Sequence, residues 1–336
     1  GGLALFIFGM GLMTDGLREA SGSGLRTVLA RAGRSPLLGI LLGTVLGTLV
    51  HSSAATVMLV GFVNAGLLSL AETVPATIGS CIGTTISMQA VSLKLGDYCY
   101  FAIALGFIIS AVSRQPRNRQ IGRALLGFGL LFLGMNVMSE AIRPHRDALQ
   151  PLLAVVDGRT WQGTLIGLGV ATALTAVWQS SGATIGMCFA LTSAGVFTEL
   201  HQVFPIVMGA NIGTCATALL SSIATHIEAR RTAVSHLLFK LITVALALGL
   251  RPWILQLSHV SSSDLIHQTA NMNTLVMTLG ALVVLPFWKL HAIVVRFLVP
   301  SRGQPPEPSH LDPILLKTPE RAIMAAIDEL RRAIDV

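Results

Sequence analysis

Apolar segments of bilayer-spanning length recur along the whole chain and limit what it can fold into. A helical membrane crossing needs about 20 predominantly apolar residues. Apolar stretches occupy residues 3–17, 36–70, 74–93, 98–112, 121–138, 162–197, 203–223, 234–250 and 269–290 of the 336-residue sequence. Charged residues make up only 12% of the chain, against about 25% in ordinary soluble domains. The sequence therefore predicts an all-α polytopic membrane protein.

Two of these stretches, 36–70 and 162–197, are too long for one crossing and are interrupted near the middle by a polar cluster. The clusters are His-Ser-Ser-Ala-Ala-Thr at 51–56 and Gln-Ser-Ser-Gly-Ala-Thr at 179–184. We interpret each stretch as a broken or re-entrant helical hairpin with a polar tip. A hairpin returns to the side from which it entered, so it contributes an even number of crossings.

The basic residues are distributed unevenly about the predicted spans. Counting an odd number of crossings for every other span puts these residues on one side: Arg18, Arg26, Arg31, Arg34, Arg114, Arg117, Arg119, Arg123, Arg230, Arg231, Lys289 and Arg296. Cytoplasmic loops carry an excess of Lys and Arg, so we expect this side and the C-terminus to be cytoplasmic, in a bacterial inner (plasma) membrane. Topology then explains the net charge of +7, and no nucleic-acid partner is expected.

Three motifs recur in the same order in the two halves of the chain. Residues 5–18 align with 130–143, residues 51–56 with 179–184, and residues 79–85 with 209–215. By the crossing count, the first span of one copy crosses the membrane in the opposite direction to the first span of the other copy. This predicts two inverted repeats. Inverted repeats that contain broken helices are typical of secondary transporters, whose binding sites lie at mid-membrane where the repeats meet.

We expect the chain to divide into four regions. They are a first transmembrane repeat (1–119), a second transmembrane repeat (120–250), a last transmembrane helix region (251–299) and a cytoplasmic tail (300–336). The tail is predicted to be a Pro-rich linker followed by an amphipathic helix with its apolar face formed by Ile323, Ile327, Leu330 and Ile334. This face would contact a second copy of the chain in a homodimer or a cytoplasmic regulator, or it would begin a larger domain.

These motifs resemble the sodium/phosphate cotransporter family, whose signature is a duplicated Gln-Ser-Ser-Ser-Ala-Thr, each copy followed by a segment like Gly-Ala-Asn-Ile-Gly-Thr-Thr. The resemblance covers roughly residues 1–300, and the tail is similar to the start of a PhoU-like domain. It implies a sodium-coupled inorganic phosphate transporter that works by alternating access in the lipid bilayer, with sodium as coupling ion and no cofactor. The chain departs from the family pattern at His51, Ala54, Ser80, Cys81, Gly182 and Lys240.

The residue types at the two tips suit both ions. Sodium prefers oxygen ligands, which interrupted helices supply as free carbonyls and side-chain oxygens. Phosphate needs donors, and a helix that restarts after a tip offers unpaired N–H groups and the positive end of its dipole. The tips contain no Arg, Lys, Asp or Glu. We therefore expect bound sodium to provide the countercharge for the anion.

With the resemblance, the motifs assign a set of candidate site residues. The binding site for substrate and ions is expected at His51, Ser52, Ser53, Thr56, Thr84, Thr85, Gln179, Ser180, Ser181, Thr184, Asn211 and Thr214. Sodium is assigned within this set to Ser53, Thr56, Gln179, Ser181 and Thr184. Ser80, Asn273 and Lys240 are secondary candidates.

Several alternatives stay open at the level of sequence. Small-residue clusters also let membrane helices pack closely. His51 would tune the pH dependence or be an ordinary core histidine. Lys240 would replace a cation or contact the anion, or else reach the interface or form an ion pair. Sulfate or a dicarboxylate would be recognised by the same donors, and an anion channel is the main alternative to a transporter.

Enzymatic function is not expected from the sequence. It contains no GxSxG, GxxxxGK[ST] or HExxH motif, which would indicate a hydrolase, a nucleotide-binding loop or a metalloprotease. The four cysteines are Cys81, Cys99, Cys188 and Cys215, and they form no CxxC pair.

Overall fold

The computed structural model describes residues 1–21, 35–93, 95–301, 323 and 327, and this part of the chain contains no strand. It divides into one unit of Gly1–Arg296 and a second of Phe297–Val336. Most of the predicted tail lies outside the described residues, as do Arg26, Arg31 and Arg34. Ile323 and Ile327 are helical and exposed.

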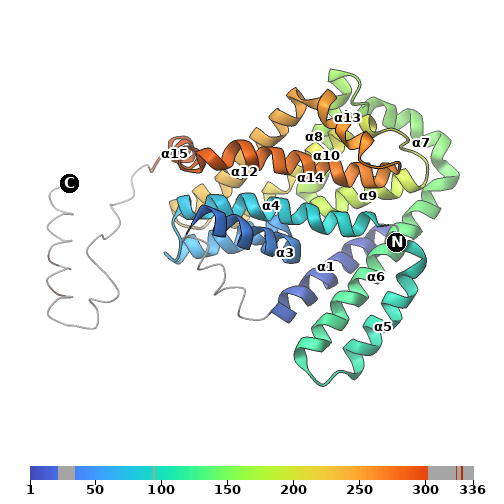
Figure 1. Ribbon diagram of the computed structural model, residues 1–336, viewed down its shortest axis with the longest axis horizontal. Helices are drawn as coiled ribbons and strands as arrows, with labels where there is room; N and C mark the ends of the chain where they lie inside the picture. The colour runs from blue at the N-terminus through green and yellow to red at the C-terminus, as the bar shows by residue number, and fades with distance from the viewer. Residues whose placement is uncertain (22–34, 94, 302–322, 324–326, 328–336) are drawn as a thin grey trace. The chain divides into compact units, whose positions relative to one another are not determined.

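Helices make up both halves of the first unit (Figure 1). The first half contains α1 (Gly2–Ser21), α3 (Pro36–Asn64), α4 (Leu70–Ser92), α5 (Cys99–Val112) and α6 (Pro116–Ile142). The second half contains α7 (Arg146–Leu153), α8 (Trp161–Trp178), α9 (Ser181–Ser193), α10 (Leu200–Gly213), α11 (Cys215–Ser221), α12 (Ile227–Gly249), α13 (Arg251–Val260), α14 (Leu265–Val284) and α15 (Trp288–Leu298). Every predicted apolar stretch is mainly helical, with turns inside 36–70, 162–197 and 203–223. The short helices α7 and α13 were not predicted, because neither forms an apolar stretch of its own.

Length and composition identify this chain as a membrane protein. Five helices in the described residues are long and apolar enough to cross a bilayer, and they occupy Pro36–Asn64, Pro116–Pro151, Leu200–Ser221, Ile227–Gly249 and Leu265–Leu298. Large apolar side chains such as Leu37, Phe101 and Phe287 are exposed on the helices. Such a surface is stable against lipid. The chain is an all-α polytopic membrane protein, as the sequence predicts.

The first predicted hairpin is present, with its turn at His51. The backbone of His51 has φ 63° and ψ 160°, which breaks α3 into two arms. In the first arm, Gly43 lies against Ala76 of α4 and Gly47 lies against Ser80, so this arm runs parallel to α4. The second arm connects the far end of the first arm to the start of α4. It must therefore run in the reverse direction.

The second hairpin has the same construction. Its turn is Gln179, which adopts a left-handed conformation with φ 55° and ψ 26° between α8 and α9. Gly209 of α10 lies against Leu168 of α8, and Gly213 lies against Thr172, so α8 and α10 also run parallel. Because α9 joins the end of α8 to the start of α10, it is the returning arm.

The two halves use matching glycine contacts around these hairpins. Gly79 and Gly83 of α4 lie against the carbonyls of Ile40 and Thr44, just as Gly209 and Gly213 of α10 lie against Leu168 and Thr172. Ile40 precedes His51 by the same number of residues as Leu168 precedes Gln179. A side chain at any of these glycines would overlap a backbone carbonyl, so each close helix contact requires glycine.

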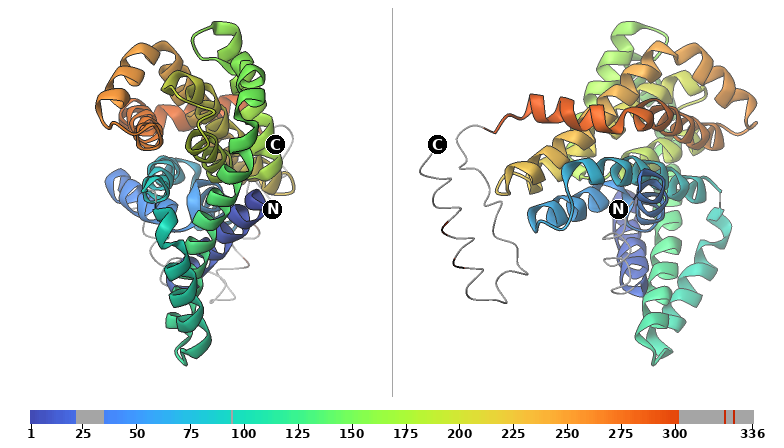
Figure 2. Two further views of the ribbon diagram at one scale, coloured as in Figure 1. Left: turned by 90° about the vertical axis from the view of Figure 1, so that its right-hand side faces the viewer. Right: turned by 60° about the vertical axis from the view of Figure 1, so that its left-hand side comes forward.

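The first span of each sequence copy packs against the other. Gly2 of α1 lies against the backbone of Gly134 in α6, Gly9 lies against Leu131, and Gly16 lies against Ala124. The residue numbers run in opposite senses, so α1 and α6 are antiparallel, and they lie side by side in both orientations shown (Figures 1 and 2).

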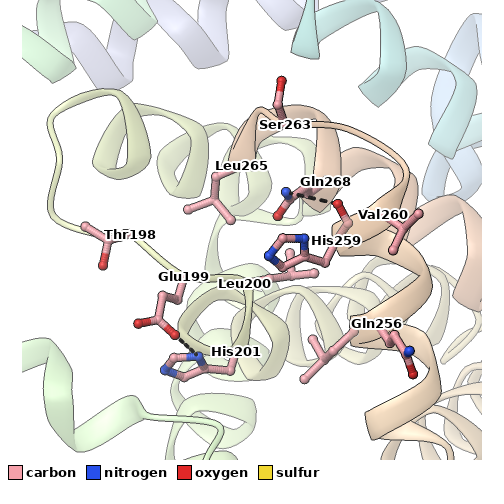
Figure 3. Close-up of a pocket in the computed structure, with 11 residues that line it drawn as sticks. Thr198, Glu199, Leu200, His201, Gln256, His259, Val260, Ser263, Leu265 and Gln268 are labelled. Carbon is pink, nitrogen blue, oxygen red and sulfur yellow. Dashed lines mark hydrogen bonds and ion pairs between the residues drawn. The ribbon is translucent and has the colours of Figure 1, made fainter.

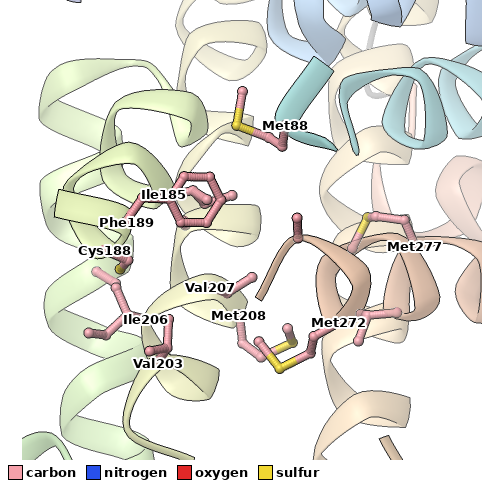
Figure 4. Packing of buried hydrophobic residues seen from close by; sticks show 14 of the residues in the cluster. Met88, Ile185, Cys188, Phe189, Val203, Ile206, Val207, Met208, Met272 and Met277 are labelled. Atoms are coloured by element: carbon pink, nitrogen blue, oxygen red, sulfur yellow. The ribbon is translucent and has the colours of Figure 1, made fainter. Parts of the chain in front are cut away.

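The buried core joins elements from both halves. Met88 of α4, Phe189 of α9, Val207 of α10 and Met272 of α14 belong to one apolar cluster, and each is fully buried (Figure 4). Two long helices complete the assembly, because α12 packs on α3, α4 and α10 while α14 packs on α4, α10 and α12. This packing holds the hairpin tips in fixed positions.

Replacement of Gly47 by Ala tests the close contact between α3 and α4. A Cβ at position 47 would overlap the Ser80 carbonyl, whereas a Cβ at Gly61, also in α3, would meet nothing within 4 Å. We expect Gly47→Ala to lower the free energy of unfolding by about 1–3 kcal/mol, the usual cost of overpacking. Gly61→Ala should leave it unchanged or raise it, because alanine favours helix. Thermal unfolding of the two purified variants in detergent measures this difference, and equal midpoints would contradict the prediction.

Candidate functional site

A cavity of about 240 Å³ lies where both hairpin tips meet α1. Its walls are the first turns of the two returning arms and one face of α1: Ile7, Met10, Gly11, Thr14, Asp15, Val50, His51, Ser53, Ala54, Ser180, Ser181 and Gly182. Segments far apart in the sequence thus contribute to one site. Of the predicted site residues, the cavity brings together His51, Ser53, Ser180 and Ser181.

The first tip is fastened to α4 by its backbone. The N–H of Ser52 donates to Thr84 Oγ1 at 2.7 Å, and Thr84 Oγ1 donates to the Ser80 carbonyl at 2.9 Å. Thr56 Oγ1 donates to the Ser52 carbonyl at 2.8 Å. All four residues are buried. The bond to Thr84 satisfies the Ser52 N–H, which the break at the tip would otherwise leave unpaired inside the protein.

The second tip is capped by its own serine. Ser180 Oγ accepts from the N–H of Ala183 at 3.2 Å, as an N-cap residue does. Thr184 Oγ1 lies 2.6 Å from Thr175 Oγ1, which ties α9 to α8. The N–H groups of Ser181 and Gly182, in the first turn of α9, have no acceptor within the helix. Both residues line the cavity, so this tip offers donors to a ligand.

Two buried polar atoms at the cavity have no hydrogen-bond partner among the described residues. They are Thr14 Oγ1 and His51 Nε2. Both atoms are inaccessible to solvent, so their side chains would have to turn before either atom could bond to a molecule in the cavity. A carboxylate is also present, because Asp15 lines the same cavity, with an oxygen 3.5 Å from Arg18.

Thr14 and Asp15 were not among the predicted site residues. The signal that would have found them is the first aligned motif, in which Thr14 and Asp15 match Ser139 and Glu140. The predicted site was drawn from the other two repeated motifs, and the motif at 5–18 was not included.

A second group of polar residues surrounds Lys240. The side chain is only 2% exposed, and its Nζ donates to Asn211 Oδ1 at 2.9 Å and to Met277 Sδ at 3.2 Å. Asn211 in turn donates to Asn273 Oδ1 at 2.9 Å. Lys240 makes no ion pair within the described part of the chain. This lysine therefore neither reaches the membrane interface nor forms an ion pair with any acidic side chain that the structure describes, the two structural roles that the sequence left open.

His236 and Cys81 connect the first tip to Lys240. His236 Nδ1 lies 3.3 Å from Thr56 Oγ1, and His236 Nε2 lies 3.5 Å from Cys81 Sγ. Lys240 acts electrostatically on both His236 and Cys81. Buried contacts therefore run from the tip at 51–56 through His236 to Cys81, within the electrostatic reach of Lys240.

The remaining predicted residues make contacts within their own helices or face outward. Thr85 Oγ1 donates to the Ile82 carbonyl, Thr214 Oγ1 to the Ala210 carbonyl and Ser80 Oγ to the Thr77 carbonyl, each at 2.8 Å. Gln179 is exposed and does not line the cavity. Its left-handed backbone shapes the second tip.

A larger cavity of about 710 Å³ lies between the start of α10 and helices α13 and α14 (Figure 3). On one side His201 has Nδ1 3.1 Å from Glu199 and Nε2 3.2 Å from Asp157, so both ring nitrogens face carboxylates. On the other side Gln268 donates to the His259 carbonyl. Glu199 is paired with Arg159 at 2.7 Å, and the cavity at the tips also contains a carboxylate, Asp15, so acidic charge does not distinguish the two cavities. The first turns of two helices, at Ser53 and Ser181, favour the cavity at the tips as the anion site.

No group of three or more His, Cys, Asp or Glu side chains in the described residues is placed to hold a metal ion. A sodium site here would consist mainly of hydroxyl, amide and carbonyl oxygens, the ligands that this hard cation prefers.

Comparison with known proteins gives matches over nearly the whole chain. The sequence profile described as Na+/Pi-cotransporter matches residues 5–140 and 145–284. The uncharacterized protein YqeW of Bacillus subtilis is 28% identical over 89% of this chain and 97% of its own length. YjbB of Escherichia coli, provisionally named for inorganic phosphate export, is 29% identical over 98% of this chain. This chain spans 61% of the length of YjbB. No solved structure gives a significant match.

Replacement of Thr84 by Val tests how the first tip is held. The change keeps the shape of the side chain but removes the acceptor for the Ser52 N–H, and a buried unpaired donor costs about 1–3 kcal/mol. We expect hydrogen exchange at residues 51–56 to become at least about fivefold faster. Hydrogen exchange followed by mass spectrometry measures this rate.

The matched control is Thr85→Val, since the neighbouring Thr85 hydroxyl is also buried but bonds only within α4. Equal exchange at residues 51–56 in the two variants would show that Thr84 does not hold the tip.

Proposed function

Because this chain belongs to the Na+/Pi-cotransporter family, we propose that it is a sodium-coupled transporter of inorganic phosphate. The family consists of transporters and not of enzymes. The observation that carries the proposal is that the two hairpin tips share one cavity, with the first turns of two helices in its wall. Phosphate and sodium would bind there together.

The anion would be held by the starts of the two returning arms. The first turn of a helix has free N–H groups and a partial positive charge, and both favour phosphate. Two such turns, at Ser53 and at Ser181, line the cavity. The hydroxyls of the serines that line the cavity would add further hydrogen bonds.

Sodium would supply charge that the cavity wall lacks. No Lys or Arg lines the cavity, and its carboxylate, Asp15, attracts a cation but not an anion. A phosphate dianion in this environment of low dielectric constant needs nearby positive charge. Bound sodium at hydroxyl and carbonyl oxygens of the tips, with Ser53 and Ser181 as candidate ligands in the cavity wall, would couple the two ions. Thr56 and Thr184 are buried behind the wall with their hydroxyls already bonded, and Gln179 faces outward, so these three would join only after rearrangement.

Alternating access would follow from two inverted repeats. The antiparallel packing of α1 and α6 and the matched glycine contacts of the two hairpins support this arrangement. The returning arm α9 has 13 residues, fewer than the roughly 17–25 of a full crossing, which supports a tip inside the bilayer. Movement of one repeat against the other would then expose the cavity to each side in turn.

The proposed membrane is the bacterial inner membrane, with the C-terminus in the cytoplasm, as the distribution of Arg and Lys favours. A coupled transporter runs in the direction set by the summed gradients of its ions. The proposal is therefore compatible with the export function that gives YjbB its name.

Phosphate flux into proteoliposomes tests the proposed function. With an inward sodium gradient we expect radiolabelled phosphate to accumulate, and Ser53→Ala/Ser181→Ala should reduce the rate at least about tenfold, because hydrogen bonds to a charged ligand contribute about 1.5–3 kcal/mol each. Ser110→Ala is the control and should retain the wild-type rate, since Ser110 lies on α5 and bonds to the Phe107 carbonyl.

Matched potassium gradients and labelled sulfate and succinate separate the alternatives. Accumulation of sulfate or succinate in place of phosphate would identify another oxyanion as substrate. Phosphate equilibration that ignores sodium would identify a channel and contradict the coupling.

Protection from chemical labelling tests the location of the site. The native cysteines are all buried, so a cysteine introduced at Ser53 provides a single accessible thiol. We expect phosphate with sodium to slow its reaction with a hydrophilic thiol reagent more than phosphate with choline does. Ser110→Cys, on α5, should show no protection. Equal labelling of Ser53→Cys in all buffers would place the anion elsewhere.

A further inference from the structure

Lys240 is a buried cationic side chain whose partners are neutral. A charge inside the membrane costs several kcal/mol unless something compensates it. The recorded acceptors for its ammonium group are one amide oxygen, Asn211 Oδ1, and the sulfur of Met277. The described carboxylates are all at least partly exposed, and none forms an ion pair with Lys240. Such a charge needs an explanation beyond packing.

The oxygen that faces Lys240 is held in place. The amide nitrogen of Asn211 donates to the Val207 carbonyl and to Asn273 Oδ1, both at 2.9 Å. These two bonds fix the orientation of the Asn211 amide group, so its Oδ1 faces the Lys240 ammonium. An oriented amide oxygen is also a good ligand for sodium.

Lys240 also lies where equivalent positions of the two sequence copies meet. Asn211 in the second copy aligns with Cys81 in the first. Lys240 donates to Asn211 and acts electrostatically on Cys81. Cys81 lies 3.5 Å from His236, which lies 3.3 Å from Thr56 of the first tip, and Ser53 of that tip lines the cavity. Buried side chains thus connect the surroundings of the ammonium to the tip that forms the proposed anion site.

We propose that the Lys240 ammonium is a built-in cation that takes the place of one coupling sodium ion. This inference rests on the proposed function and specifies its ion requirement. The ammonium carries the same single charge as sodium and engages the oxygen that would otherwise bind it. It would supply the positive charge of one sodium ion, so one sodium ion fewer would be needed for each phosphate.

The ionisable groups facing Lys240 leave this charge uncompensated. They are His236 on its own helix, Cys81 from α4 and Cys215 from α11. None of them is an acid that would form an ordinary ion pair. A bound oxyanion is therefore the partner that would neutralise the ammonium.

Sodium binding to variants at position 240 tests the inference without any use of phosphate. Lys240→Asn removes the charge and supplies an oxygen, so sodium should enter the site and raise the thermal unfolding midpoint beyond the wild-type response. Lys240→Arg keeps the charge and should respond as the wild type does. The titration compares sodium chloride with choline chloride, because a ligand that binds only the folded state stabilises it. Identical sodium responses of Lys240→Asn and the wild type would overturn the inference.

Phosphate transport gives a second readout that separates this inference from the proposed function. Lys240→Asn should carry one more sodium ion per phosphate, seen as a steeper dependence of flux on sodium concentration. If the wild type moves no phosphate but Lys240→Asn still gains a sodium response in the unfolding assay, the proposed substrate fails and the built-in cation stands.

Lys240→Met covers the case in which Lys240→Asn does not fold. It removes the charge and provides no oxygen, so sodium cannot replace the ammonium. We expect its apparent affinity for phosphate to fall about tenfold or more, as losses of a buried charge partner do, and high sodium should not restore it. Lys240→Arg should keep wild-type affinity. Wild-type phosphate affinity in Lys240→Met would overturn the inference.

Discussion

The structure depends on how two breaks in transmembrane helices are satisfied. Inside a bilayer every backbone N–H and C=O needs a partner within the protein or in a water-filled cavity. At His51 the break is satisfied partly by Thr84, and at Gln179 partly by the cap that Ser180 provides. The donors left over in the first turns line one cavity. The proposed binding site is thus a consequence of the two helix breaks, because each break leaves unpaired backbone donors within the membrane-spanning part of the protein.

Close helix packing positions the two breaks. Gly79 and Gly83 in one half, and Gly209 and Gly213 in the other, bring the first arm of each hairpin into backbone contact with the following helix. The returning arms then have no freedom in direction, and their starts meet α1. Lys240 belongs to the same design, because it lies between the helices that follow the two hairpins.

The sequence was sufficient to predict the fold class, the long apolar helices and both hairpins, because apolar length and repeated motifs are local features. It also predicted His51, Ser53, Ser180 and Ser181, which the cavity brings together. It missed the contribution of α1 and the role of Cys81, since contacts between distant helices leave no periodic signal. The environment of Lys240 was equally beyond reach, because its burial and neutral partners depend on helices from both halves.

The most direct test of the central claim is a cryo-electron microscopy structure of the protein in sodium phosphate. The account predicts tetrahedral density in the cavity between the tips, in contact with the first turns at Ser53 and Ser181, and no such density in choline phosphate. Density in the larger cavity beside Glu199 and His201, with the tip cavity empty, would contradict it. So would phosphate density that is the same with and without sodium.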